Sequence, residues 1–182
     1  MKLLSPAGIS AITDVSYGAR AALDPGDRVG LLANSFPGSV DFIRAVGTEL
    51  EKRQGRRDFV FREKGGIRES TLTLSVGAVD TLADRCDVVF AAYGHCGSCS
   101  SAIVRDVIAL AQRGVRVCAF VTDEFADTAL FVARSAGMSD VPIVWLPHPM
   151  AARSAAERAD IASRVADSAL AAIEGVRDVA VA

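Results

Sequence analysis

Short apolar runs alternate with amphipathic segments from residue 28 to residue 174, and this alternation restricts the chain to one class of fold. The run Val88–Ala92 (VVFAA) contains no polar residue, which is typical of a strand buried on both faces. Strands that alternate with helices predict a parallel sheet with helices on both faces and right-handed crossovers. The predicted strands are Arg28–Ala33, Asp58–Arg62, Asp87–Tyr93, Val115–Thr122 and Val141–Leu146.

The segments between these strands place apolar residues on one side, as helices that cover a sheet do. One of them carries Ile103 and Val107 on the same face, and Gly114 after it is a typical C-cap. We predict a doubly wound, flavodoxin-like (Rossmann-like) three-layer α/β sandwich with a parallel five-stranded sheet. It forms a single domain over residues 28–182, preceded by an N-terminal arm, residues 1–27, with one short helix at Ser16–Leu23. The other predicted helices are Val40–Arg53, Ser75–Arg85, Ser100–Arg113, Asp127–Ala136 and Ala155–Glu174.

The composition restricts the kinds of binding partner and the cellular location that we expect for this protein. With 182 residues, half of them apolar, the chain can bury a sizeable core, and its net charge of −2 gives no electrostatic case for nucleic acid or an anionic membrane. The apolar runs are too short to span a bilayer, and the first residues lack a signal-peptide pattern, so we expect a cytoplasmic protein. The alanine-rich last helix and the arm are candidates for a homodimer contact.

Two of the four cysteines lie where a buried strand turns into a helix. Cys96 and Cys99 follow the third predicted strand, at a turn that collects free backbone N–H groups and the positive end of the helix dipole. A thiol at such a turn ionises more readily, and the thiolate is its reactive form. Gly97 keeps the backbone slim there, and Ser98 and Ser100 can cap the helix or bind a substrate. We expect the remaining cysteines, Cys86 and Cys118, to be buried and to pack as apolar residues.

Further polar residues follow the other strands and are predicted to meet at the same edge, because ligands of such sheets bind outside the carboxyl ends of the strands. His95 and His148 are candidate acids or bases for the thiol chemistry, and Asp123 or Glu124 is a carboxylate that caps a helix or orients a histidine. Lys64 and Arg68 are expected to be solvated loop charges. The candidate substrate-binding residues are Asn34, Ser35, Gly97, Ser98, Ser100, Thr122 and Glu124.

Three functional classes fit this edge. In the first, Cys96 attacks a small organic substrate and forms a covalent adduct, with Cys99 as a resolving or supporting thiol. In the second, the two cysteines cycle between dithiol and disulfide with a thiol or thioredoxin-type reductant. In the third, they belong to a metal-binding or redox-sensing module, although the second Cys-x-x-Cys pair typical of structural zinc sites is missing. No dinucleotide fingerprint follows the first strand, so we predict no cofactor.

The segment Gly94–Cys99 (GHCGSC) resembles the motif of the UGSC family, in which many members carry selenocysteine at the position of Cys96. The segments 30–35, 122–125 and 141–149 resemble further parts of that family, in the same order. A more distant likeness is to the selenocysteine domain of glycine reductase component B and D-proline reductase. These resemblances imply that Cys96 is the nucleophile and Cys99 its thiol partner. Ala102 stands where those reductases have a further cysteine, and no pyruvoyl precursor region is recognisable, so amine reduction is not implied.

Overall fold

Five parallel strands form the centre of the molecule in the order β2-β1-β3-β4-β5. The computed structural model describes residues 12–18, 20–55 and 58–175. This strand order is flavodoxin-like, and it confirms the predicted α/β fold class. The strands are β1 (Val29–Ala33), β2 (Phe59–Glu63), β3 (Val88–Gly94), β4 (Arg116–Thr122) and β5 (Ile143–Leu146).

The burial of the strands explains their continuous apolar sequences. Every residue of β1 and β3 is buried, and so is every residue of β4 after Arg116. Strands in the middle of a parallel sheet have helices on both faces, so neither face leaves room for polar side chains. The edge strand β2 is mostly half-buried, and β5 alternates between buried and half-buried positions.

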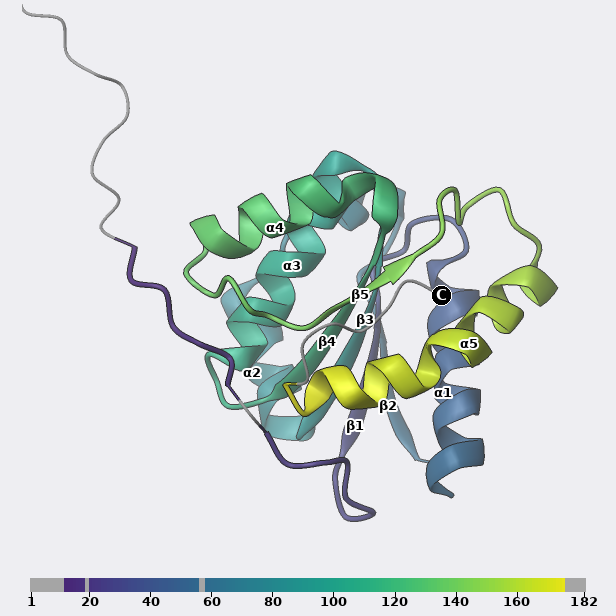
Figure 1. Ribbon diagram of the computed structural model, residues 1–182, viewed down its shortest axis with the longest axis horizontal. Helices are drawn as coiled ribbons and strands as arrows, with labels where there is room; N and C mark the ends of the chain where they lie inside the picture. The colour runs from purple at the N-terminus through teal and green to yellow at the C-terminus, as the bar shows by residue number, and fades with distance from the viewer. Residues whose placement is uncertain (1–11, 19, 56–57, 176–182) are drawn as a thin grey trace, which may run out of the picture.

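Helices cover both faces of the sheet (Figure 1). The helices α1 (Ser39–Gln54) and α5 (Ala155–Ile173) pack on one face, where Phe42, Phe90 and Phe120 contribute to the core. The other face carries α2 (Val76–Arg85), α3 (Gly97–Ala111) and α4 (Ala126–Ser135), and two short 3₁₀ helices complete the fold, η1 (Ile67–Thr71) and η2 (Asp123–Phe125). Within the described ranges, no helix is long and apolar enough to cross a membrane.

The short helix predicted at Ser16–Leu23 is wrong, because the described residues of this segment have no helical structure. Tyr17 is instead buried at the end of the sheet, where its hydroxyl donates to the carbonyl of Ile173 (3.0 Å) and accepts the N–H of Val117 (3.0 Å). The backbone of Arg20 donates to the carbonyl of Glu174. The backbone N–H of Arg20 thus finds in a distant residue the kind of partner that a helix would have supplied locally.

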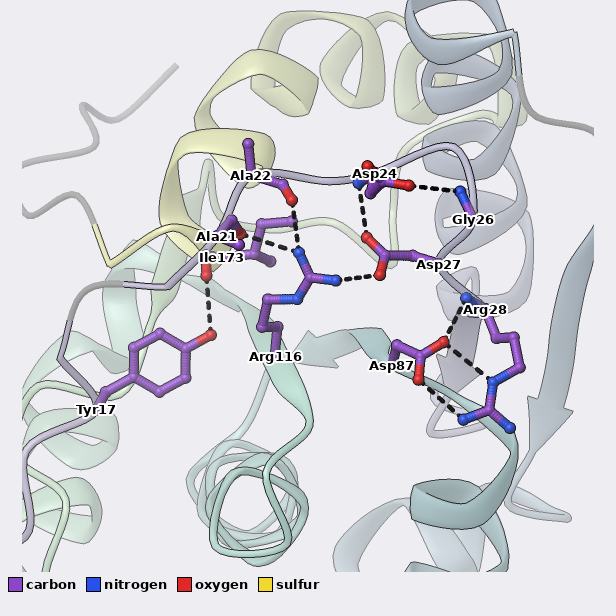
Figure 2. A network of polar contacts seen from close by, with 10 residues as sticks. All are labelled: Tyr17, Ala21, Ala22, Asp24, Gly26, Asp27, Arg28, Asp87, Arg116 and Ile173. Atoms are coloured by element: carbon purple, nitrogen blue, oxygen red, sulfur yellow. Dashed lines mark hydrogen bonds and ion pairs between the residues drawn. The ribbon is translucent and has the colours of Figure 1, made fainter.

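Two arginines join the chain before β1 to the amino ends of β3 and β4 (Figure 2). The guanidinium of Arg116 donates to the carbonyls of Ala21 (2.9 Å) and Ala22 (2.7 Å) and pairs with Asp27 (2.5 Å). Arg28 donates to both carboxylate oxygens of Asp87, and these hydrogen bonds hold the pKa of Asp87 at about 2. These contacts hold the chain before β1 against the amino edge of the sheet, where Asp87 and Arg116 also border a cavity of about 310 Å³.

Candidate functional site

The sequence-predicted cysteine pair lies at the carboxyl edge of the sheet, beside the switch point between β1 and β3. The chain leaves β1 into α1 on one face and leaves β3 into α3 on the other. In doubly wound sheets the crevice at this point is the usual place for a ligand. The loops that flank it are residues 34–38 after β1 and residues 95–96 after β3.

Cys96 and Cys99 form a near-disulfide pair at the start of α3. Their Sγ atoms are in contact, and their Cα atoms are 5.4 Å apart, a separation that suits a disulfide. Cys96 is the N-cap of α3, and its Sγ accepts the N–H of Cys99 (3.2 Å). The Sγ of Cys99 accepts the N–H groups of Cys96 (2.8 Å) and His95 (3.2 Å). Cys99 is fully buried and Cys96 is half-buried, so the two sulfur atoms differ in their access to solvent.

Of the two glycines around the pair, Gly94 is the one that must lack a side chain. A Cβ atom at Gly94 would lie 2.6 Å from the hydroxyl and 2.9 Å from the Cα of Ser100, so this glycine lets α3 approach β3 closely. Gly97 has no positive φ, and a Cβ atom there would meet nothing within 4 Å. The expectation that Gly97 keeps the backbone slim is therefore wrong, since it is an ordinary first residue of the helix.

The serines of this turn have different surroundings. Ser98 is exposed, and its hydroxyl lies 3.5 Å from the Sγ of Cys96. Ser100 is buried against Gly94, and its hydroxyl has no hydrogen-bond partner within the described part of the chain. Of the two, Ser98 is placed where a molecule bound to Cys96 would contact it.

The residues after β1 connect this loop to the neighbouring strands. Asn34 is fully buried, and its amide nitrogen donates to the carbonyl of Tyr93 (2.8 Å) while its oxygen accepts the N–H groups of Phe36 (3.2 Å) and Tyr93 (3.3 Å). This side chain ties the carboxyl ends of β1 and β3 together. Ser35 has a positive φ of 64° and donates to Glu63 at 3.0 Å, so its hydroxyl faces the end of β2.

Both histidines lie at this edge, with their ring centroids 4.5 Å apart. The Nε2 atom of His95 accepts the N–H groups of Met150 (3.0 Å) and Ala151 (3.2 Å), and its ring stacks on Phe36 at 4.9 Å. Burial lowers the pKa of His95, and the neighbouring His148 lowers it further. Sequence reasoning missed Phe36, and an aromatic residue in a loop after a strand is only a weak signal for such a contact.

The segment after β4 holds His148 in place. The Nδ1 atom of His148 lies 3.2 Å from the hydroxyl of the buried Thr122, and its backbone N–H donates to Asp123 (3.2 Å). Asp123 is thus the carboxylate that contacts this histidine segment, whereas Glu124 is exposed to solvent. The structure places Thr122 and His148 together, as their strand positions predict.

Lys64 was expected to be a solvated charge, and this expectation is wrong. Its side chain is only 3% exposed and forms an ion pair with Asp106 of α3, whose side chain is 1% exposed. Its ammonium group also donates to the carbonyl of Leu72 (2.7 Å), and Asp106 accepts the N–H of Leu74 (2.7 Å). The buried pair therefore attaches the loop after β2 to α3, while Arg68 remains exposed.

The cysteine turn brings together two thiols that differ in their access to solvent. Across residues 12–18, 20–55 and 58–175, no three His, Cys, Asp or Glu side chains are grouped to hold a metal ion. An accessible thiol beside a buried thiol, both at a helix N-terminus, can instead form and resolve a bond to a substrate.

Comparison with known proteins gives one match that covers nearly all of the chain. Neither curated proteins nor solved structures show a match. The model of the UGSC family matches residues 2–175, which include the whole sheet, the cysteine pair and the His148 segment. This agrees with the family suggested by the segment Gly94–Cys99, and the protein therefore belongs to the UGSC family.

Proposed function

We propose that this protein is a cysteine-dependent enzyme in which Cys96 attacks a small organic substrate and Cys99 resolves the covalent adduct. The observation that carries the proposal is the contact between a half-buried and a fully buried sulfur atom at the first turn of α3. Only Cys96 is accessible enough to meet a substrate, and only Cys99 is close enough to displace what Cys96 has bound. Ser98 supplies a hydroxyl for the substrate beside the Sγ of Cys96, and His148 lies at the same edge next to His95, held by the buried Thr122.

The proposed reaction has two steps on the protein, followed by reduction of the cysteine pair. The thiolate of Cys96 attacks an electrophilic atom of the substrate, and the leaving group departs with the bonding electron pair. The thiolate of Cys99 then attacks the Sγ atom of Cys96, so that the bond to the substrate fragment breaks and the fragment leaves with its electron pair and takes a proton. The pair is left as a disulfide, and an external dithiol of the thioredoxin class reduces it by two electrons.

The second candidate is a thiol–disulfide oxidoreductase, and the sulfur contact favours it as well. In that case both the leaving group and the released fragment are thiols, and the protein turns over disulfides with a dithiol as the only reductant. The difference between the two candidates is the atom that Cys96 attacks, carbon in one case and sulfur in the other.

Replacing Cys99 by Ser should trap the adduct. The reduced Cys99→Ser protein, treated with 2-hydroxyethyl disulfide, should keep one mercaptoethanol group on Cys96, because no second thiol is in place to release it. The wild-type protein should lose two hydrogen atoms in forming the Cys96–Cys99 disulfide and keep no adduct. Intact-protein and peptide mass spectrometry read both results.

Cys96→Ser is the matched control, and it should carry no adduct at residues 96–99, because the remaining thiol of Cys99 is buried. An adduct on Cys99, or a lasting adduct on Cys96 in the wild-type protein, contradicts the assigned roles.

A further inference from the structure

The N-terminus of α1 follows the loop after β1, at the edge of the sheet where ligands of doubly wound folds bind. The first N–H groups of an α-helix have no partner within the helix. In α1 the N–H of Ser39 reaches the carbonyl of Phe36 (2.9 Å), and the N-cap residue, Gly38, has no side chain that could accept from the others. Gly38 and Val40 are half-buried, so a small ligand can reach this turn from the solvent.

The guanidinium group of Arg158 lies against the same turn. Arg158 belongs to α5, which packs beside α1 on one face of the sheet (Figure 1). A Cβ atom at Gly38 would lie 2.7 Å from the Cζ and 2.9 Å from the Nε of Arg158, so the guanidinium rests directly on the backbone of this glycine. A cation at the positive end of a helix dipole is unfavourable unless an anion lies close to it.

Two buried donors at this turn have no hydrogen-bond partner among the described residues. They are the hydroxyl of Ser39, which is fully buried, and the Nε of Arg158, whose residue is only 8% exposed. The other nitrogens of Arg158 are occupied, since Nη1 donates to the carbonyl of Arg153 and Nη2 pairs with Asp41 at 2.9 Å. Buried polar groups nearly always have a partner, so these two donors indicate a ligand that accepts hydrogen bonds.

We propose that the first turn of α1 and Arg158 form a binding site for an oxyanion, either a phosphate or a carboxylate group. The helix N-terminus attracts an anion through its N–H groups and its dipole, and the guanidinium adds a charge-assisted hydrogen bond. Asp41 offsets part of the charge of Arg158, but its side chain is 55% exposed and contacts only Nη2, so Nε remains for the ligand. The site does not depend on the reaction proposed for Cys96.

An NMR titration of the ¹⁵N-labelled full-length protein tests this site, with inorganic phosphate and acetate as separate probes at constant ionic strength. We expect saturable shifts of the amide signals of Gly38, Val40 and Asp41. Acetamide has the shape of acetate but no charge, and it should leave these signals unchanged. The N-terminus of α2 is the internal control, because Ser75 caps it and accepts the N–H of Ala78. The Ala78 signal should not move.

The two anions also distinguish the class of ligand. Tighter binding of phosphate identifies a phosphate ester as the natural ligand, tighter binding of acetate identifies a carboxylate, and either result supports the site. The proposal is overturned if neither anion gives a saturable shift at residues 38–41, or if acetamide shifts these signals as much as acetate does.

Two variants separate an anion site from a purely structural arginine. Arg158→Gln should weaken anion binding by about tenfold or more, because it removes a charge-assisted hydrogen bond. Asp41→Asn removes the competing carboxylate and keeps an acceptor for Nη2, so this variant should bind the anion several-fold more tightly than the wild type. Asp41 is largely solvated, so Asp41→Asn should fold even if Arg158→Gln does not. Unchanged or weaker anion binding in Asp41→Asn would show that Arg158 only joins α5 to α1.

Discussion

Replacing Asp106 by Asn should lower the free energy of unfolding by about 3–5 kcal/mol, the usual cost of removing one partner of a buried ion pair. The Asn side chain has nearly the same shape and can still accept the N–H of Leu74. The loss is therefore that of the negative charge, which leaves the ammonium group of Lys64 buried without an anion. Both side chains are almost inaccessible to water, at 1% and 3% exposure, so solvent cannot replace the missing partner. Urea denaturation at neutral pH measures the effect.

Two controls make this prediction specific. The exposed pair Asp80–Arg113 also contacts α3, and Asp80→Asn should cost about 1 kcal/mol at most. The double variant Lys64→Met/Asp106→Leu should recover much of the lost stability. Burial raises the pKa of Asp106 even beside Lys64, which indicates how unfavourable an isolated charge is at this place. Equal losses for the buried and exposed pairs would show that Lys64 and Asp106 are solvated.

Replacing Gly94 by Ala should both destabilise the fold and disturb the cysteine turn. The new Cβ atom would lie 2.9 Å from the Cα of Ser100, so the first turn of α3 must move away from β3. Overpacking of this kind costs about 1–3 kcal/mol. The movement also lengthens the N–H contacts to the Sγ of Cys99, so we expect slower resolution of an adduct on Cys96. Thermal unfolding and the rate of disulfide formation measure the two effects.

Gly97→Ala is the matched control, three residues further along the same turn. A Cβ atom there meets nothing within 4 Å, and the residue has no positive φ, so the variant should be as stable as the wild type or slightly more stable. If Gly97→Ala is the more damaging change, the close approach of α3 to β3 is not what Gly94 provides.

Much of the fold can be predicted from the sequence because strands buried in a parallel sheet have continuous apolar sequences. Runs such as Val88–Ala92 have to be apolar throughout, and the helices between them show a single apolar side. The edge of the sheet that holds Cys96 and His148 then follows from the direction of the strands. These features depend on local patterns, and the structure confirms them.

Other features depend on contacts between distant segments, which local patterns do not record. Lys64 looks like a loop charge until α3 places Asp106 beside it. Tyr17 lies in a segment with no strong periodicity, yet its hydroxyl is bound by Ile173 and Val117. The acceptor role of His95 likewise depends on amides that lie far along the chain.

The role of Cys96 as nucleophile is tested most directly by the pH dependence of iodoacetamide labelling of the native, reduced protein, read by peptide mass spectrometry for each cysteine. We expect Cys96 to be labelled first, with labelling already fast well below pH 8.5, the ordinary range of a free thiol. Cys99, Cys86 and Cys118 should react slowly, because all three are buried. Slow labelling of Cys96 with an ordinary thiol profile would contradict the claim that it is the nucleophile.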